Sequence, residues 1–467
     1  MKIKRPPLTR REFVQTSLLG AGALALPSLI PARVFGADAP SNKINILQIG
    51  CGRIARSMDL PGILAQDRAR VVAVCDLDSI RVADAQRYVE GFYGRKGQPI
   101  KVSTYGDYRE ALQRADIDAV AISTPDHWHA QPIIEAALAG KDVYVQKPLT
   151  MTVREGRAVS DLIRAKQRAF QIGSQQRSAA NFRLACELVR NGRLGRLHTV
   201  KIGLPTDPAG PVEPEMPVPA NLDYARWLGP TQLMPYTENR VHPQNPDPKK
   251  RYGDRPGWLR IESYCLGMIT GWGSHHVDIA HWGMDTEQTG PVAIEGRAEF
   301  PQSALWNVHG AYHIESRYAN GATMIIDNTF PNGVRVEGSD GWLFVTRGTA
   351  DPTNGNSKAL NASDPDILKT PLGTKEIRLH ASENNDHHRD WINSIVTRGA
   401  AVTSPEVAHR STSACNLGWI AMKLGRKLTW DPGRESFVRD PVAEAMLTRA
   451  ERAPYGGLAA EQAARRA

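Results

Sequence analysis

Short apolar runs and longer amphipathic stretches alternate along the first third of the chain. An apolar run bounded by glycine or acidic residues favours a buried β-strand, and a stretch with helical periodicity favours an α-helix. The pattern predicts strands at residues 43–50, 70–76, 118–123 and 142–146, and helices at residues 53–66, 105–112 and 129–140. Strands that alternate with helices indicate an α/β domain in which helices cover a parallel sheet.

The later part of the chain has a different pattern. Apolar and polar positions alternate at residues 311–318 and 322–330, which is typical of strands with one buried face. Helices are expected at residues 385–395 and 411–425. Residues 204–256 are rich in proline and lack a clear period, so we expect a long functional loop that contains one short helix at residues 222–230.

A glycine motif follows the first predicted strand. Gly50, Gly52 and Ala55 stand in a G-x-G-x-x-A arrangement, and Asp76 ends the second strand 21 residues after Ala55. Gly50 permits a tight turn from strand to helix, Gly52 lets backbone N–H groups approach a pyrophosphate, and the helix N-terminus attracts negative charge. A structural glycine turn is the alternative, but the surrounding strand, helix and acidic residue favour a dinucleotide site. We expect that site to include the next two residues, Arg53 and Ile54.

Asp76 also bears on the choice of cofactor. Its carboxylate can accept hydrogen bonds from both ribose hydroxyls of NAD and would repel the 2′-phosphate of NADP. NAD is therefore the expected cofactor. Arg81 lies close enough in the sequence to leave NADP as the alternative.

Polar side chains follow the two later strands of the first domain. Ligand sites of parallel sheets lie at the carboxyl ends of the strands, so we expect residues 124–129 and 146–148 to meet beside the cofactor. The candidate residues in these two segments are Thr124, Pro125, His127, His129, Gln146 and Lys147.

These motifs together resemble the Gfo/Idh/MocA family, named for glucose–fructose oxidoreductase, inositol dehydrogenase and a rhizopine-catabolism protein. T-P-D-H-W-H at residues 124–129 is similar to the family's T-P-N-x-x-H, Q-K-P-L to its E-K-P, and G-S-Q-Q-R at residues 173–177 to the strand that opens its second domain. The resemblance implies a Rossmann dinucleotide-binding domain at residues 42–170 and a C-terminal α/β domain at residues 171–450. The second domain is expected to hold a large, mostly antiparallel open sheet. That sheet commonly serves oligomer contacts in the family, which implies a homodimer or homotetramer.

A second group of acid–base side chains lies within residues 263–283. A helix that begins near Gly273 would place His275 and Asp278 on related faces. Asp278 is then either an orienting partner of the imidazole or an ordinary helix residue. His275 and His276 are adjacent, and adjacent side chains on a helix diverge, so we predict no metal site here.

The same stretch resembles the family's D-x-G-x-H motif, with Gly273 as its glycine and His275 as its histidine. Gly271 stands where the family has aspartate, and Gln146 stands where it has glutamate. Both departures are expected to remove a carboxylate from the neighbourhood of Lys147.

The resemblance implies a chemistry for Lys147 and His275. A lysine held beside the cationic nicotinamide ring would have a lowered pKa and would act as the general base toward a substrate hydroxyl while the cofactor takes a hydride. His275 would bind that hydroxyl or share the proton transfer. We expect an oxidoreductase that acts on a CH–OH group of a sugar or sugar derivative. The residues that suit recognition of this carbohydrate substrate are Arg177, Tyr236, Trp258, Tyr264 and Asp278.

The first residues resemble a twin-arginine export signal. Basic residues surround the pair Arg10 and Arg11, an apolar stretch follows at residues 14–30, and small residues gather near residue 39. The apolar stretch is too short and too rich in small residues for a comfortable membrane span. An uncleaved anchor or a chance arginine pair is the alternative. We predict a signal peptide at residues 1–39, the twin-arginine machinery as a partner, and a periplasmic or otherwise exported mature protein without a stable membrane span.

The leader changes the meaning of the net charge. The 467 residues include 58 Lys+Arg and 49 Asp+Glu, which gives +9 and by itself would invite a nucleic-acid partner. Residues 1–37 hold six basic residues and one acidic residue, so the rest of the chain carries about +4. Because the sequence also shows no arginine- or lysine-rich helix, we predict no nucleic-acid binding.

Export would constrain how the cofactor is used. Free NAD is not expected outside the cytoplasm, so we expect NAD to be tightly bound and regenerated within a redox-neutral cycle. Two family precedents fit: an oxidoreductase that oxidises one sugar and reduces another, and an NAD-dependent α-N-acetylgalactosaminidase type of glycoside hydrolase that uses transient C3 oxidation and elimination. A non-catalytic sugar-binding homologue is a further alternative, which the missing carboxylates favour and the retained Lys147 and His275 oppose.

Overall fold

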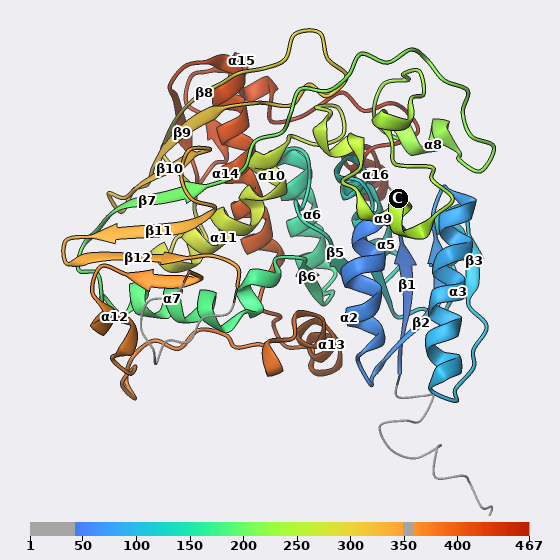
Figure 1. Cartoon of the computed structure of the whole chain (residues 1–467), viewed down its shortest axis with the longest axis horizontal. Helices are drawn as coiled ribbons and strands as arrows, with labels where there is room; N and C mark the ends of the chain where they lie inside the picture. The colour runs from blue at the N-terminus through green and yellow to red at the C-terminus, as the bar shows by residue number, and fades with distance from the viewer. Residues whose placement is uncertain (1–42, 349–357, 467) are drawn as a thin grey trace, which may run out of the picture. The chain divides into compact units, whose positions relative to one another are not determined.

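The computed structural model describes residues 43–348 and 358–466 (Figure 1). The predicted leader at residues 1–39 lies outside the described residues. Two β-sheets with their covering helices make up the described chain. None of the helices found within the described residues is long and apolar enough to cross a bilayer.

The first sheet is parallel and has the strand order β3-β2-β1-β4-β5-β6. Its strands are β1 (Ile44–Ile49), β2 (Ala69–Cys75), β3 (Ser103–Tyr105), β4 (Ala119–Ile122), β5 (Asp142–Val145) and β6 (Phe170–Ile172). Its helices are α2 (Leu60–Leu64), α3 (Ser79–Arg95), α4 (Tyr108–Leu112), α5 (Ala130–Leu138) and α6 (Val153–Ala165). The parallel α/β domain predicted from the sequence is thereby confirmed.

Helices pack on both faces of this sheet because alternate strand residues point to opposite sides. Ile46 of β1 belongs to a core with residues of α2, α3 and α13 (His387–Thr397), whereas its neighbour Leu47 belongs to a core with residues of α4, α5 and α6. Helix α3 was not expected from the hydrophobic pattern. The Asp78 carboxylate caps its first turn by accepting hydrogen bonds from the N–H groups of Ile80 and Arg81.

The second sheet has the strand order β13-β12-β11-β7-β10-β9-β8-β14-β15. Its strands are β7 (Leu197–Gly203), β8 (Ala293–Ala298), β9 (Tyr312–Arg317), β10 (Thr323–Asp327), β11 (Gly333–Gly338), β12 (Gly341–Val345), β13 (Leu360–Ala362), β14 (Leu428–Asp431) and β15 (Ser436–Phe437). Neighbouring strands are antiparallel except for β7 and β10, which pair in parallel. The mostly antiparallel sheet implied by the family resemblance is confirmed.

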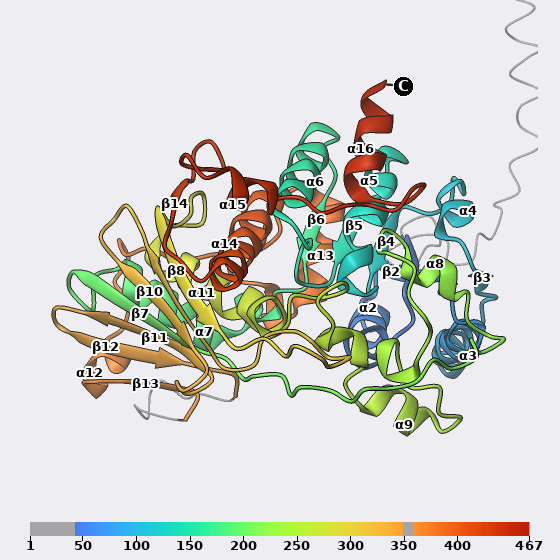
Figure 2. The same ribbon diagram turned by 90° about the horizontal axis from the view of Figure 1, so that it is seen from above.

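Helices α7 (Ala180–Arg190), α11 (Gly273–Met284) and α14 (Pro405–Leu424) pack on one face of the second sheet and share its core (Figure 2). The other helices of this part are α8 (Tyr224–Leu228), α9 (Pro248–Gly253), α10 (Met268–Gly271), α12 (Pro365–Lys369), α15 (Pro441–Ala445) and α16 (Gly457–Arg466). Helix α14 begins six residues before the predicted start at residue 411, because Ser404 caps it and Pro405 suits a first helical turn.

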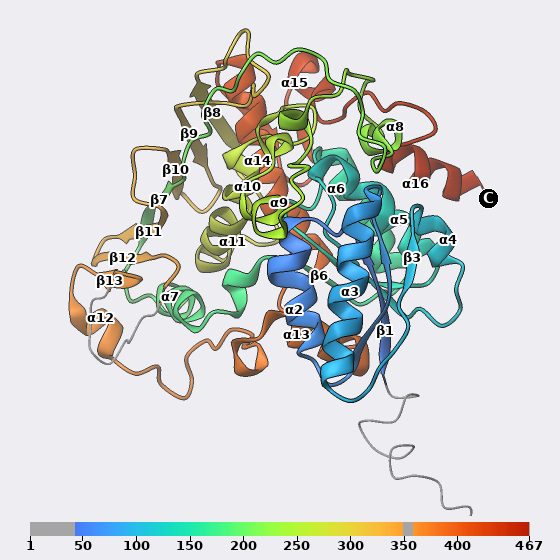
Figure 3. The same cartoon turned by 45° about the vertical axis from the view of Figure 1, so that its right-hand side comes forward.

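The later part of the chain also packs against the first domain. Helices α13, α14 and α16 contact α2, α6 and α5 respectively, and α14 lies between the two domains (Figure 3). Strand β6 ends at Ile172 and crosses the boundary that the sequence placed at residue 170. The two predicted domains are therefore joined by interleaved elements.

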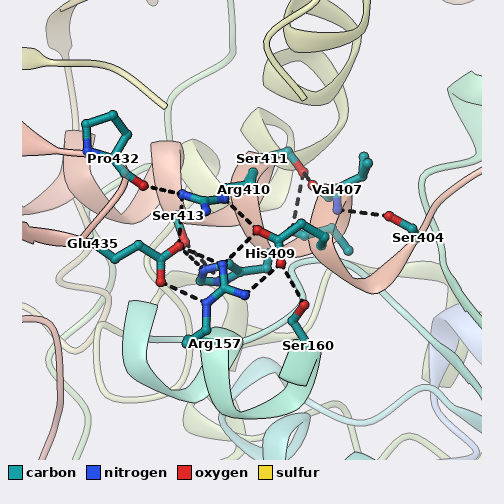
Figure 4. A network of polar contacts seen from close by, with 12 residues as sticks. Arg157, Ser160, Ser404, Val407, His409, Arg410, Ser411, Ser413, Pro432 and Glu435 are labelled. Atoms are coloured by element: carbon teal, nitrogen blue, oxygen red, sulfur yellow. Dashed lines mark hydrogen bonds and ion pairs between the residues drawn. The ribbon is translucent and has the colours of Figure 1, made fainter. Parts of the chain in front are cut away.

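An ion-pair network connects α14 with α6 (Figure 4). Arg157 of α6 binds Glu406 of α14 through two N···O contacts of 2.6 and 2.8 Å, and it binds Glu435 at 2.8 and 2.9 Å. Arg410 and His409 of α14 contact the same Glu435 at 3.0 and 2.7 Å. Burial raises the pKa of Glu406, but hydrogen bonds from Arg157 and Arg410 outweigh burial and lower it to about 2.

A buried carboxylate lies behind the end of β5. The helix after β1 contains a π-helical turn at Ala55–Asp59, and the Asp59 side chain is 0 % exposed. Its oxygens accept hydrogen bonds from the Ser123 hydroxyl at 2.6 Å and from the Gln146 amide at 2.8 Å. A glutamate at position 146 would bring a second carboxylate against Asp59, and two buried like charges are unfavourable. Asp59 therefore gives a physical reason for glutamine where the family has glutamate.

We expect the variant Gln146→Glu to lose about 2 kcal/mol of unfolding free energy at pH 7, because one buried carboxylate would face another. The loss should shrink as the pH falls toward about 5, since protonation of the new glutamate restores a donor toward Asp59. Urea unfolding at both pH values measures this effect.

The double variant Asp59→Asn/Gln146→Glu should recover most of the loss, because the amide and the carboxylate exchange places. The exposed Gln98→Glu change is the matched control. Equal stability of Gln146→Glu and the original protein at pH 7 would contradict the pairing of Gln146 with Asp59.

Candidate active site

A pocket lies where the carboxyl ends of β1, β2, β4 and β5 meet. The predicted cofactor residues that line it are Gly50, Gly52, Arg53, Ile54, Asp76, Thr124, Pro125, Gln146 and Lys147. Residues of the later part of the chain close its other side, among them His242, Pro243, Arg251 and Trp258. The first domain thus supplies the strand ends and the second part supplies a cover.

The turn after β1 requires glycine. Gly50 has φ +82°, and a Cβ atom there would lie 2.7 Å from the carbonyl carbon of Ser123. At Gly52 an added Cβ would meet a guanidinium nitrogen of Arg81 at 3.7 Å, which is an ordinary van der Waals distance. Gly50 and Gly52 line the pocket without side chains at the start of a helix, and such a backbone suits a pyrophosphate.

The Asp76 carboxylate is held by the backbone. One oxygen accepts a hydrogen bond from the Cys51 N–H at 2.6 Å, and the other accepts one from the Asp78 N–H at 2.9 Å. Burial and the neighbouring charge of Asp78 raise the pKa of Asp76, whereas these N–H groups lower it. Asp76 lines the pocket at the position where the fingerprint expects an acceptor for ribose hydroxyls. The residues present therefore fit a nicotinamide dinucleotide.

The proline-rich stretch covers this end of the pocket, and we call residues 221–251 the latch. Asp78 accepts hydrogen bonds from the Asn221 amide at 2.8 Å and contacts the His242 imidazole at 3.0 Å. The backbone N–H of Ser79 donates to the carbonyl of Asn221 at 2.9 Å. Arg251 forms an ion pair with Asp84 of α3. The latch is thus fastened to the loop between β2 and α3.

Arg81 is occupied within this contact. Its side chain is 3 % exposed, and it donates hydrogen bonds to the carbonyl groups of Pro243 and Arg251 at 3.3 and 3.4 Å. Its guanidinium also lies 5.0 Å from the ring centroid of Tyr252. Arg81 therefore lines the pocket while its guanidinium is bound to the latch.

The two predicted histidines after β4 do not line the pocket. The His129 ring lies between two carbonyl oxygens, with Nδ1 2.6 Å from Pro148 and Nε2 3.1 Å from Thr124. It joins the two strand ends and so positions the loop that carries Lys147. His127 packs between Trp227 and Tyr264, with Nε2 2.9 Å from the Trp227 carbonyl. Their expected contact with the cofactor is replaced by these packing roles.

Lys147 lines the pocket and is partly exposed to it. Within the described part of the chain, its amine has no hydrogen bond or ion pair. Burial lowers the pKa of Lys147, the carboxylate of Asp126 raises it, and the guanidinium groups of Arg255 and Arg347 lower it. The neutral amine, which is the form a general base needs, is thereby favoured.

His275 lies at the start of α11 and is 5 % exposed. Its Nδ1 is buried without a hydrogen-bond partner among the described residues. Burial lowers the pKa of His275 well below its usual value, and the charges of Lys147 and Arg347 lower it further. A neutral imidazole near Lys147 with an unused nitrogen can bind a substrate hydroxyl.

Asp126 is a residue that the sequence reasoning missed. It lines the pocket, its side chain is 4 % exposed, and its Oδ2 has no partner among the described residues. Burial raises the pKa of Asp126, whereas the charges of His129 and Lys147 lower it. Gln146 and Gly271 still replace the two family carboxylates, and Asp126 is a further carboxylate whose charge reaches Lys147. An aspartate in T-P-D-H-W-H, where the family has asparagine, was the available indication.

Most of the predicted substrate residues are placed elsewhere. Arg177 and Asp278 bind each other through two contacts of 2.7 and 2.8 Å, and both side chains are 2 % exposed. This pair fastens α11 to the segment before α7, so Asp278 does not orient His275.

The aromatic candidates divide in the same way. Tyr236 and Tyr264 are 3 % and 0 % exposed and belong to a core that the latch itself largely forms, with its residues Tyr224 and Trp227. Trp258 lines the pocket, as a substrate residue would. Within the described residues, no group of three or more His, Cys, Asp or Glu side chains could hold a metal ion.

Two family models match the chain. Residues 44–174 match the oxidoreductase family's NAD-binding Rossmann fold, and residues 211–457 match its C-terminal alpha/beta domain. These ranges contain the pocket, Lys147 and His275.

Individual proteins show the same relationship. An uncharacterized oxidoreductase of Bacillus subtilis, YrbE, is 25% identical over 327 residues, which cover 68% of this chain and 76% of YrbE. A Shewanella protein named glycosyl hydrolase family 109 protein 2 is 30% identical over 205 residues, 40% of this chain and 44% of that protein.

A solved structure, the aldose-aldose oxidoreductase of Caulobacter crescentus, has a TM-score of 0.57 at 19% identity and covers 83% of this chain and 99% of that one. It shows a shared fold. Together with the two family models, which match both domains, these similarities show that the chain belongs to the Gfo/Idh/MocA family of oxidoreductases.

Proposed function

We propose that the protein is an NAD-dependent oxidoreductase that oxidises a CH–OH group of a sugar or sugar derivative, with Lys147 as the general base. The observation that carries this proposal is the unpaired amine of Lys147 at the wall of the dinucleotide pocket, whose pKa burial lowers. A non-catalytic sugar-binding role is less consistent with this environment, because a scaffold has no need of an unpaired lysine whose charge acts on a buried imidazole with an unpartnered nitrogen.

Side chains of the protein itself take up the proton that the substrate hydroxyl loses. A bound nicotinamide would accept the hydride from the substrate carbon. Lys147 takes the hydroxyl proton as the C–H bond breaks, so the alcohol becomes a carbonyl. His275 binds the same oxygen through its neutral imidazole, and Asp126 stabilises the ammonium that forms on Lys147. The reverse proton transfer accompanies reduction.

Loss of the amine should abolish turnover. We expect Lys147→Ala and Lys147→Arg to lower kcat about a thousandfold or more, because neither side chain can accept the proton at neutral pH. The measurement is the rate at which the bound nucleotide is reduced, recorded by absorbance after sugars are added without free cofactor. In the unchanged protein the rate should rise as the pH rises through the lowered pKa of Lys147, since the neutral amine is the active form.

Nucleotide content should stay the same in both variants. Lys166→Ala, an exposed change at the end of α6, is the control and should leave turnover unchanged. Activity that survives in Lys147→Ala would overturn the assignment of the base.

The latch supports a tightly held cofactor. Because His242, Pro243 and Arg251 line the pocket and are fastened to the β2–α3 loop, a dinucleotide could leave only after these contacts open. The backbone-held carboxylate of Asp76 supports NAD over NADP.

We expect purified protein to release NAD(H) when it is denatured, and His242→Ala to lose this nucleotide faster during dialysis. The variant removes one contact of 3.0 Å with Asp78, worth about 1 kcal/mol and hence about a fivefold faster release. Chromatography of the released nucleotide measures both results.

The matched control is His198→Ala, an exposed histidine on β7. Protein that carries NADP(H), or that carries no nucleotide and oxidises sugars only with added NAD, would contradict this prediction.

A second candidate function is glycoside hydrolysis through transient oxidation. The glycosyl hydrolase family 109 relative supports it, and so does Asp126, because elimination needs a second acid–base group besides Lys147. Cleavage of an aryl glycoside without net reduction of the bound nucleotide would select this candidate. Interconversion of two sugars by the bound cofactor would select the redox cycle.

We further propose that residues 1–39 direct export through the twin-arginine route and that the open sheet mediates homo-oligomer contacts. Replacement of Arg10 and Arg11 by lysine should abolish accumulation outside the cytoplasm, because this route requires the arginine pair. Cell fractionation and immunoblotting measure the distribution. A change of Lys2 and Lys4 to arginine keeps the charge and should leave export intact. Export of the Arg10→Lys/Arg11→Lys variant at the normal level would exclude the route.

A further inference from the structure

We propose that the sugar bound at this site carries a carboxylate, as a uronic acid does, and that Arg347 binds this group with help from Arg255. The inference rests on the proposed function, because it names the substrate class of the same site. It comes from how the positive charges around Lys147 are placed and balanced.

The first observation is at Gly271, where the family has aspartate. A Cβ atom added to Gly271 would lie 3.9 Å from a guanidinium nitrogen of Arg255. The space of the lost carboxylate therefore adjoins an arginine. Arg255 pairs with Asp207, but Asp207 also faces Arg260, with Nε 3.7 Å away. The single carboxylate of Asp207 thus faces two guanidinium groups and can neutralise only one of their two positive charges.

The second observation is Arg347, which lies two residues after the end of β12. Its guanidinium lies 4.5 Å from the ring centroid of Trp272, which is three residues before His275. The Gln176 amide, in the orientation that satisfies both of its contacts, accepts from Arg347 Nε at 3.2 Å and donates to the His275 carbonyl at 3.2 Å. These contacts hold the arginine beside the candidate catalytic histidine.

The positive charge of Arg347 is not neutralised by a carboxylate of the described residues. Arg347 is exposed, and no carboxylate of residues 43–348 or 358–466 forms an ion pair with it. Its charge, like that of Arg255, reaches Lys147 and lowers the pKa of that amine. Two guanidinium groups, those of Arg255 and Arg347, therefore lie close enough to Lys147 to act on it, and the carboxylate of Asp126 opposes their effect.

An anionic ligand would relieve this repulsion. A planar guanidinium forms two parallel hydrogen bonds with a carboxylate, and such pairs are among the stronger and more directional polar contacts in proteins. A neutral sugar would leave the charge of Arg347 without a carboxylate partner among the described residues, and Arg255 would still share Asp207 with Arg260. The arrangement therefore favours a sugar acid over the neutral sugar of the same ring configuration.

The test compares sugar acids with their neutral counterparts. The pairs are glucuronate and glucose, galacturonate and galactose, and mannuronate and mannose, titrated calorimetrically into the protein with its bound nucleotide. We expect at least one acid to bind about tenfold or more tightly than its partner, and Arg347→Gln to remove this difference without weakening the neutral sugar. Arg347→Lys keeps the positive charge but loses the paired N–H donors of the guanidinium, so this variant should retain part of the preference for the acid.

A matched arginine controls for general charge and for folding. Arg335 of β11 lies 4.0 Å from the ring centroid of Trp342 and pairs with Glu337, so Arg335→Gln removes a similar stacked arginine outside the site. This control should keep the acid preference, and equal thermal stability of the variants shows that they are folded.

The outcomes separate the two proposals. No acid preference in any pair, the absence of binding included, overturns the carboxylate inference, as does a preference that Arg347→Gln leaves unchanged. A preference that depends on Arg347 supports it. If that preference is found but no sugar reduces the bound nucleotide, the carboxylate inference stands and the proposed oxidoreductase activity fails.

Discussion

The placement of α14 is the constraint on which both halves of the described chain depend, and the Arg157 network fixes it. Arg157 uses its guanidinium on two carboxylates at once, Glu406 and Glu435, and Arg410 binds the same two. Glu435 is 5 % exposed, so its pairing takes place largely out of water. Removing one partner from such a network leaves an uncompensated buried charge, which costs several kcal/mol. The two sheets are therefore held at one spacing by a rigid helix rather than by a flexible linker.

This spacing matters because α14 touches the segments that carry both candidate catalytic residues. The Thr412 hydroxyl accepts a hydrogen bond of 3.2 Å from the N–H of Leu149, two residues after Lys147. One turn along the helix, the Cys415 sulfur lies 3.3 Å from where a Gly273 Cβ would stand, two residues before His275. A Cβ at position 273 would be closer to this sulfur than an ordinary van der Waals contact, so the sulfur would have to shift by a few tenths of an ångström. Close helix packing thus gives a reason for the glycine shared with the family motif, and the same helix contacts the segments that carry Lys147 and His275.

The sequence predicted those parts that local pattern determines. The dinucleotide motif consists of a strand, a glycine turn, a helix and an acidic residue that are neighbours in the chain. Their order therefore predicted the dinucleotide-binding domain and its parallel sheet. The missed features depend on contacts between distant residues. Gln146 looked like a lost carboxylate until Asp59, 87 residues earlier, was seen to face it. Arg177 and Asp278 looked like ligands because charged residues near a histidine suggest chemistry, yet 101 residues apart in sequence they neutralise each other in the core.

The latch shows why the proline-rich stretch is ordered although it has no regular period. The Asp78 carboxylate caps the first turn of α3 and also binds Asn221 and His242 of the latch. One buried carboxylate therefore holds the helix and the latch together. Hydrogen bonds from Asn221 and the contact with His242 outweigh burial and keep the pKa of Asp78 well below its usual value, which means that the contact persists in mildly acidic surroundings. Any dinucleotide in the pocket lies between this fastened segment and the turn at Gly50. Its release then requires opening of the protein's own contacts in addition to loss of the ligand's, so slow exchange can arise from the stability of the latch even where direct contacts with the dinucleotide are few.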